Sequence, residues 1–101
     1  MNLTKNTDTN HLVPTEFYLC QNYPNPFNEK TIIKFCVAYK TKVKLEVFNS
    51  EGKMIKTLLD EEKEAGTYEV NWNIKNLPKG DYFYQLKAGN FISRKKLTII
   101  K

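Results

Sequence analysis

The octet is the stretch Gln21-Asn22-Tyr23-Pro24-Asn25-Pro26-Phe27-Asn28. It restricts the backbone conformation more than any other part of the chain. Its two prolines fix φ, remove two backbone donors and push the residues before them toward extended geometry. This excludes a helix and disfavours a fully paired strand. The asparagines can bond to nearby backbone, and we expect Tyr23 and Phe27 to be apolar anchors. The octet therefore predicts a rigid, extended segment that is docked by its aromatic side chains and leads into a strand near Thr31.

Apolar and polar residues alternate along most of the chain after the octet, which is typical of strands with one buried face. The inward stripes are Ile33, Phe35 and Val37; Val43, Leu45 and Val47; Tyr68, Val70 and Trp72; and Tyr82, Tyr84 and Leu86. Turns are expected at 49–52, 76–80 and 88–90, and a charged loop at 60–65 after a return strand at 53–59. The pattern predicts an all-β, immunoglobulin-like β-sandwich of about seven antiparallel strands over residues 16–101.

The same alternation predicts which individual aromatic side chains are buried and which are exposed. Trp72 falls on the inward phase and is expected in the core. Phe48 and Phe83 fall on the outward phase and are candidates for an exposed contact.

The octet also begins a series of motifs. Leu19 and the octet are followed by Thr31-x-Ile33-x-Phe35, Val43-x-Leu45-x-Val47-Phe48-Asn49-x-x-Gly52, Ala65-Gly66-Thr67-Tyr68-x-Val70-x-Trp72, Gly80-x-Tyr82-Phe83-Tyr84-x-Leu86, Gly89-x-Phe91 and Lys95-Lys96-Leu97. In this order they resemble the type A C-terminal sorting domains of the type IX (Por) secretion system of Bacteroidetes, over residues 17–101. The chain departs from the usual pattern at Glu29, where the family most often has proline, and in its short link from Trp72 to Gly80.

The resemblance implies a secretion signal that carries an N-terminally fused cargo from the periplasm to the outer-membrane surface or the extracellular space. Its implied partners are the outer-membrane translocon, a shuttle protein and a surface sortase. Recognition in this family is attributed mainly to the C-terminal part, which here corresponds to Pro78, Gly80, Tyr82, Gly89, Arg94, Lys95, Lys96, Leu97 and Lys101. We expect the three consecutive cations to contact the partner, the two glycines to act through backbone geometry and Tyr82 to act through packing.

The charge distribution points independently to the same region. The net charge is +5, and after Asp81 there are five basic residues and no acidic one. A terminal strand with positive side chains could add to the edge of a partner's sheet. The alternative is that lysines only protect an edge strand from aggregation. Nucleic-acid binding is disfavoured because no reader motif accompanies the charges.

The N-terminal residues 1–15 are polar and lack periodicity, so we expect a linker or disordered tail there. They contain no apolar stretch of the kind a secretory signal requires, and no run in the chain reaches the length of a membrane-spanning helix. We therefore expect the chain to be the C-terminal piece of a larger protein, with a short independent gene as the alternative. An isolated copy is a candidate for a strand-swapped homodimer.

Residue types that support catalysis or cofactor binding are scarce. The one histidine, His11, lies in the expected tail, so zinc, serine–histidine and cysteine–histidine sites are excluded from the folded part. No cofactor motif is present, and the acidic run at 60–64 matches no calcium loop. Cys20 and Cys36 are expected as two independent thiols, with a disulfide as the alternative. The sequence predicts a non-catalytic domain. The alternatives to a sorting signal are a passive immunoglobulin-like spacer and a carbohydrate-binding module.

Overall fold

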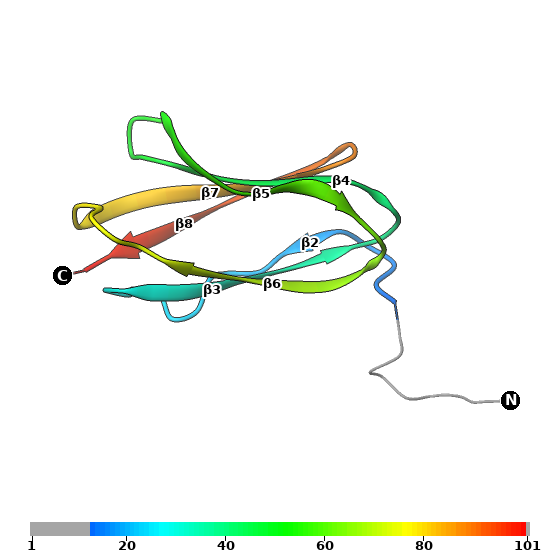
Figure 1. Cartoon of the computed structure of the whole chain (residues 1–101), viewed down its shortest axis with the longest axis horizontal. Helices are drawn as coiled ribbons and strands as arrows, with labels where there is room; N and C mark the ends of the chain where they lie inside the picture. The colour runs from blue at the N-terminus through cyan, green and yellow to red at the C-terminus, as the bar shows by residue number, and fades with distance from the viewer. Residues whose placement is uncertain (1–12, 101) are drawn as a thin grey trace, which may run out of the picture.

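The computed structural model describes residues 13–100, which form seven strands and no helix (Figure 1). The octet lies between the first two strands. The strands are β2 (Tyr18–Leu19), β3 (Lys30–Val37), β4 (Thr41–Phe48), β5 (Met54–Lys63), β6 (Gly66–Asn73), β7 (Gly80–Ala88) and β8 (Phe91–Ile99). Residues 1–12 of the expected tail, and Lys101, lie outside the described residues.

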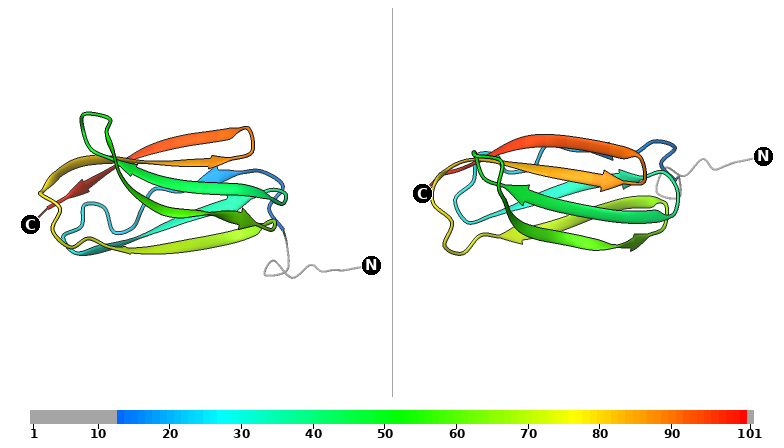
Figure 2. Two further views of the ribbon diagram at one scale, coloured as in Figure 1. Left: turned by 45° about the horizontal axis from the view of Figure 1, so that its top comes forward. Right: turned by 90° about the horizontal axis from the view of Figure 1, so that it is seen from above.

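Two antiparallel sheets pack face to face, as the views in Figure 2 show. One sheet has the strand order β2-β3-β6 and the other has the order β5-β4-β7-β8. The chain crosses between the sheets after β3, β5 and β6, so neighbours in sequence are not always neighbours in a sheet. The prediction of an immunoglobulin-like sandwich is confirmed.

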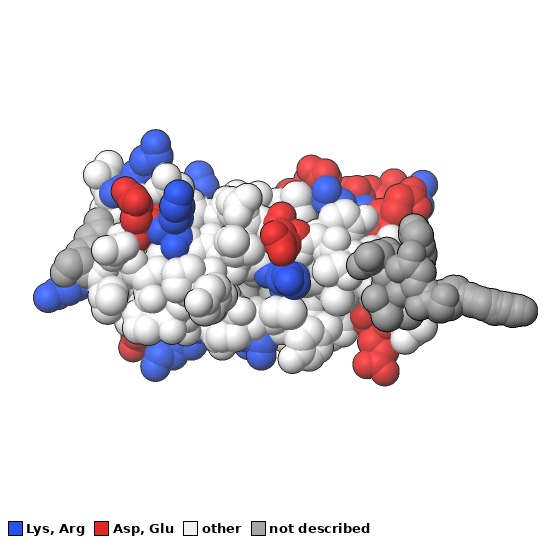
Figure 3. All heavy atoms as spheres, turned by 90° about the horizontal axis from the view of Figure 1, so that it is seen from below, with Lys and Arg blue, Asp and Glu red and all other residues white. Residues whose placement is uncertain are grey.

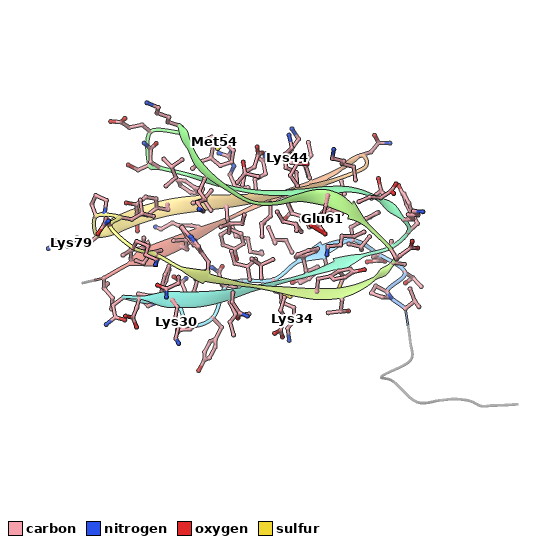
Figure 4. All side chains as sticks on the ribbon, viewed as in Figure 1. Lys30, Lys34, Lys44, Met54, Glu61 and Lys79 are labelled. Atoms are coloured by element: carbon pink, nitrogen blue, oxygen red, sulfur yellow. The ribbon has the colours of Figure 1, made fainter. Side chains whose placement is uncertain are left out.

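The core lies between the sheets and consists of the side chains that alternate inward. Side chains that are fully or nearly buried include Ile33, Phe35, Val37, Val43, Leu45, Val47, Trp72, Tyr82, Tyr84, Leu86, Leu97 and Ile99. Lys30 and Lys34 project from the opposite, outer face of β3, and Lys44 and Met54 project from the outer face of the other sheet (Figure 4). The strict period of two places apolar groups inside and charges outside, where they keep their hydration.

Strand β5 is longer than the sequence predicts. Residues 60–63, expected in a charged loop, continue the strand and pair with residues 41–44 of β4. Opposite charges on the two strands support this pairing, because Lys42 Nζ lies 3.6 Å from an Asp60 carboxylate oxygen. Register shifts interrupt this ladder between Leu45 and Glu46 and between Val47 and Phe48. High charge is therefore compatible with a strand here, since the side chains lie at a solvent-facing edge.

The octet is docked differently from the sequence prediction. Phe27 is 3% exposed and packs 6.3 Å from Trp72 between ring centroids, so it is an apolar anchor as expected. Tyr23 is 78% exposed, and its prediction as a second anchor is wrong. The second buried side chain is Asn22, whose Nδ2 donates to Pro24 O at 3.1 Å and to Thr31 Oγ1 at 3.0 Å. Polar bonds thus replace the second aromatic contact.

Tyr23 is nevertheless fixed through its backbone. Its N–H donates to Ile32 O at 3.0 Å, and its carbonyl accepts from Ile32 N at 2.9 Å. This reciprocal pair of bonds continues the pairing of β3 on the side that β2 occupies, so the exposed phenol ring has a rigid support.

The hydroxyl group of Tyr84 joins the octet to the opposite sheet. It donates to Cys20 O at 2.6 Å and accepts from the Asn22 N–H at 2.7 Å, and the side chain of Tyr84 is fully buried. Burial raises the pKa of Tyr84 to about 12, although the hydrogen bond from Asn22 acts in the lowering direction. The hydroxyl therefore stays protonated and satisfies two backbone groups that water cannot reach.

The two cysteines are free thiols, as expected. Cys36 is opposite Tyr18 in the β2–β3 ladder, whereas the Cys20 N–H donates to Lys34 O. The thiols are thus offset along the ladder, and the alternative of a disulfide is wrong for this structure.

We predict that Phe27→Ala lowers the free energy of unfolding by about 3–5 kcal/mol, because it leaves a cavity in the core. Tyr23→Ala in the same octet should change it by less than about 0.5 kcal/mol, because the removed ring contacts mainly solvent. Denaturant unfolding followed by Trp72 fluorescence measures both. Equal losses for the two variants would contradict this description of the octet.

We predict that Tyr84→Phe destabilises the domain by about 2 kcal/mol at neutral pH, because Cys20 O and the Asn22 N–H lose their partner. The folded pKa of Tyr84, about 12, exceeds the unfolded value of about 10. Its contribution is therefore complete below pH 10 and is lost as the pH rises toward 12, by roughly 2–3 kcal/mol in total. Unfolding measured from pH 8 to pH 11.5 should show a steeper decline for the unmodified chain than for Tyr84→Phe, and parallel curves would refute the assignment.

Candidate partner interface at the terminal hairpin

The residues expected to recognise a partner come together in the hairpin of β7 and β8. The register pairs Gly80 with Ile99 and Tyr82 with Leu97, and Gly89 lies in the two-residue turn between the strands. Lys101 lies outside the described residues. The sequence therefore identified neighbouring positions in space, while their role in recognition stays a prediction.

Three of these positions serve the fold directly. Tyr82 and Leu97 are buried, and the Tyr82 hydroxyl donates to Pro78 O at 2.8 Å. This bond fixes the loop before β7, and a role of Tyr82 in recognition stays a prediction. Gly89 has φ +60°, a left-handed conformation that side chains disfavour, so glycine is required by the turn.

The three consecutive cations do not form one cluster. Arg94 and Lys96 lie on the outer face of the sheet, whereas Lys95 follows the inward phase and is half-buried. The Arg94 guanidinium lies 4.7 Å from the Phe48 ring centroid, and its Nε donates to Gln85 Oε1 at 3.2 Å. Lys96 Nζ lies 3.6 Å from an Asp81 carboxylate oxygen. The period of two in a strand separates neighbouring side chains, so contact with all three at once requires a partner at the edge of β8.

Phe48 is consequently less exposed than an outward-facing aromatic would be, because Arg94 covers its ring. Cation–π contact of this kind is worth about 0.5–1 kcal/mol at exposed sites. It also holds the Arg94 side chain flat against the sheet.

The outer edge of β8 is partly covered by the octet. Phe27 N donates to Thr98 O at 3.1 Å, and Ile100 N donates to Phe27 O at 2.8 Å. Thr98 N donates to Asn25 Oδ1 at 3.0 Å, and Gln21 Nε2 donates to Lys96 O at 2.7 Å. Four hydrogen bonds thus cap the end of β8 and the residue after it, from Lys96 O to Ile100 N.

These capping bonds were not predicted from the sequence. The residues that they join are separated by more than 70 positions, as with Gln21 and Lys96. The polar character of the octet indicated local turn bonds, and nothing in a period-two pattern shows which edge such a segment will cover.

The outer face of the β2-β3-β6 sheet has a different character. Figure 3 shows charges toward its ends, one adjoining pair of opposite charges near the middle, and uncharged atoms over most of the surface between them. One ion pair, Lys34 with Glu69 at 3.4 Å, joins β3 to β6 on this face. Ile32 is exposed beside the backbone of Tyr23, and a hollow of about 550 Å³ lies between Ile32 and Asn71. The exposed aromatic residues do not form a row along a strand.

A comparison with protein families identifies the chain. The family described as the secretion system C-terminal sorting domain matches residues 21–101, which includes the octet and six of the seven strands. The chain belongs to this family. A search among curated proteins found no match. The prediction of a type IX sorting domain is thereby confirmed, and the family is in general non-catalytic.

Within residues 13–100, no group of three or more histidine, cysteine, aspartate or glutamate side chains is placed to hold a metal ion. No described helix could cross a membrane. The terminal hairpin brings together most of the positions expected to recognise a partner and is the candidate site.

We predict that Asn25→Ala costs about 1 kcal/mol of stability and accelerates hydrogen exchange of the Thr98 amide, because that amide loses its acceptor. Amide exchange measured by NMR reports both effects at one position. Asn28→Ala, a change of the same kind in an exposed residue of the octet, is the control and should leave Thr98 protected. Unchanged Thr98 exchange in Asn25→Ala would show that Asn25 does not cap the strand.

Proposed function

We propose that the domain is an address label, which the outer-membrane translocon and a shuttle protein recognise and from which a surface sortase then separates the cargo. Membership of the sorting-domain family supports delivery to the cell surface or the extracellular space. We further propose that the cargo precedes the domain in the parent protein and crosses the periplasm with it.

The terminal hairpin is the surface proposed for recognition, and its charge is the observation that carries this proposal. Lys87, Arg94 and Lys95 have no carboxylate within ion-pair distance among residues 13–100. Lys44 and Lys56 of the same sheet are also unpaired, so the hairpin is distinguished by having no acidic residue after Asp81. Uncompensated charge on one surface raises the rate of encounter with a partner of opposite charge and helps to set its orientation.

We predict that a fluorescent reporter with a secretory signal and residues 16–101 reaches the surface of a Bacteroidetes host only if the type IX translocon works. The double variant Lys95→Gln, Lys96→Gln should lose most of this delivery and change stability by no more than about 1 kcal/mol, because the Lys96 ion pair is exposed. Surface fluorescence and thermal unfolding are the measurements.

The matched control is Lys53→Gln, Lys56→Gln, which removes the same charge at the opposite edge of the same sheet. It should leave delivery intact. If the reporter stays in the periplasm of hosts with and without a working type IX translocon, the domain is a passive spacer instead. If the control and the test variant lose delivery equally, overall charge rather than the hairpin would be responsible.

A further inference from the structure

The outer edge of β8 consists of a capped part and an open part. The backbone groups of Thr98 and Ile100 form hydrogen bonds with the octet. The backbone N–H and C=O groups of the even-numbered residues of β8 therefore face away from β7, while those of odd-numbered residues such as Leu97 bond with β7. The backbone groups of Ile92 and Arg94, and the N–H of Lys96, also face outward. No described backbone group bonds to them, because β8 is the last strand of its sheet; β2 contacts β8 but belongs to the other sheet.

The residues whose backbone groups face outward in this open part, Ile92, Arg94 and Lys96, are themselves exposed. The Arg94 side chain contacts the Phe48 ring and Gln85 Oε1 on the face of the sheet, and the Lys96 ammonium forms an ion pair with Asp81. Ile92 is 61% exposed and offers apolar surface at the same place. Edge lysines that only prevent pairing would extend over the edge, whereas two of these cations lie against the face of the sheet.

The charge around the open part determines which segment fits there. Lys87 is opposite Ile92 in the ladder and lies on the outer face with Arg94, whereas Lys95 lies on the inward phase. None of the three has a carboxylate within ion-pair distance among residues 13–100. A segment that adds a strand here gains backbone hydrogen bonds from the edge and ion pairs from its own carboxylates.

We infer that the open part of β8, from Ile92 to Lys96, binds an extended acidic segment of a protein partner by strand addition. Gln21 marks the end of this site, because its Nε2 already occupies Lys96 O at 2.7 Å. The inference rests on the proposed function and specifies how the hairpin contacts its partner.

A second copy of the chain fits this site less well. Its acidic strand β5 carries Asp60, Glu61 and Glu62, but each of these carboxylates is paired with a lysine of the same chain, at 3.6, 3.1 and 3.9 Å. Pairing of β8 with β5 of another copy would have to break these ion pairs.

The first test is NMR on the whole chain with a synthetic nine-residue peptide in which glutamate alternates with valine or threonine. We expect the peptide to slow hydrogen exchange of the Ile92, Arg94 and Lys96 amides at least tenfold and to leave the Thr98 amide unchanged, since Asn25 already occupies that donor. The same peptide with lysine in place of glutamate should have no effect. Equal protection by both peptides, protection centred on β5 or no protection would each overturn the inference.

The second test separates the backbone from the side chain at one residue. Ile92→Pro removes one outward N–H, at an edge position where proline costs no ladder bond, and should weaken binding of the acidic peptide at least tenfold. Ile92→Thr keeps the N–H and should weaken it by less than threefold. If Ile92→Pro does not fold, the exchange pattern of the unmodified chain still decides the question.

The export reporter distinguishes the two levels of the proposal. If the unmodified reporter is exported and Ile92→Pro is exported equally well, strand addition is not the mode of recognition and the sorting function stands. If the unmodified reporter is not exported, the sorting function fails, whatever the peptide does.

Discussion

The buried hydroxyl group of Tyr84 is the contact on which the position of the octet depends. It satisfies Cys20 O and the Asn22 N–H at the point where the chain leaves β2, next to the core. Asn22 then fixes Pro24 and Thr31 through its amide. Without this polar network, two backbone groups would be buried without partners, at a cost of about 1–3 kcal/mol each. An apolar side chain at position 84 could fill the space but could not direct the chain across to β8.

The same network connects the fold to the proposed interface. Because the octet is held in one place, Asn25 and Phe27 meet β8 at Thr98 and cover its end. The cover stops at Gln21, which leaves an open stretch of backbone beside uncompensated positive charge. The octet thus protects part of an edge that would otherwise be open along its whole length, and it limits strand addition to a short, defined site.

Much of this structure could be predicted from the sequence, for identifiable reasons. Alternation gave the core stripes and the sandwich, since a period of two has only one buried face to assign. It could not distinguish the charged end of β5 from a loop, because residues 60–63 are held by pairing with Lys42 and its neighbours, which are distant in sequence. The prediction that Tyr23 is an apolar anchor was wrong for a similar reason. Composition shows that an aromatic residue is present but does not show in which direction a proline-flanked backbone points its side chain. The positions of the terminal hairpin were placed correctly, whereas the separation of Arg94 from Lys95 follows from strand geometry.

The direction of the contact between the octet and β8 affects how the domain responds to force. Phe27 and Ile99 form a parallel bridge, and the described chain starts at one end of the sandwich and finishes at the other (Figure 1). Tension applied to these ends pulls the octet and β8 past each other along a common axis. The hydrogen bonds between them are then loaded in shear and carry the tension together, whereas an antiparallel pair pulled at its open end separates one bond at a time. The octet therefore acts as a mechanical clamp that resists stretching of the chain from end to end.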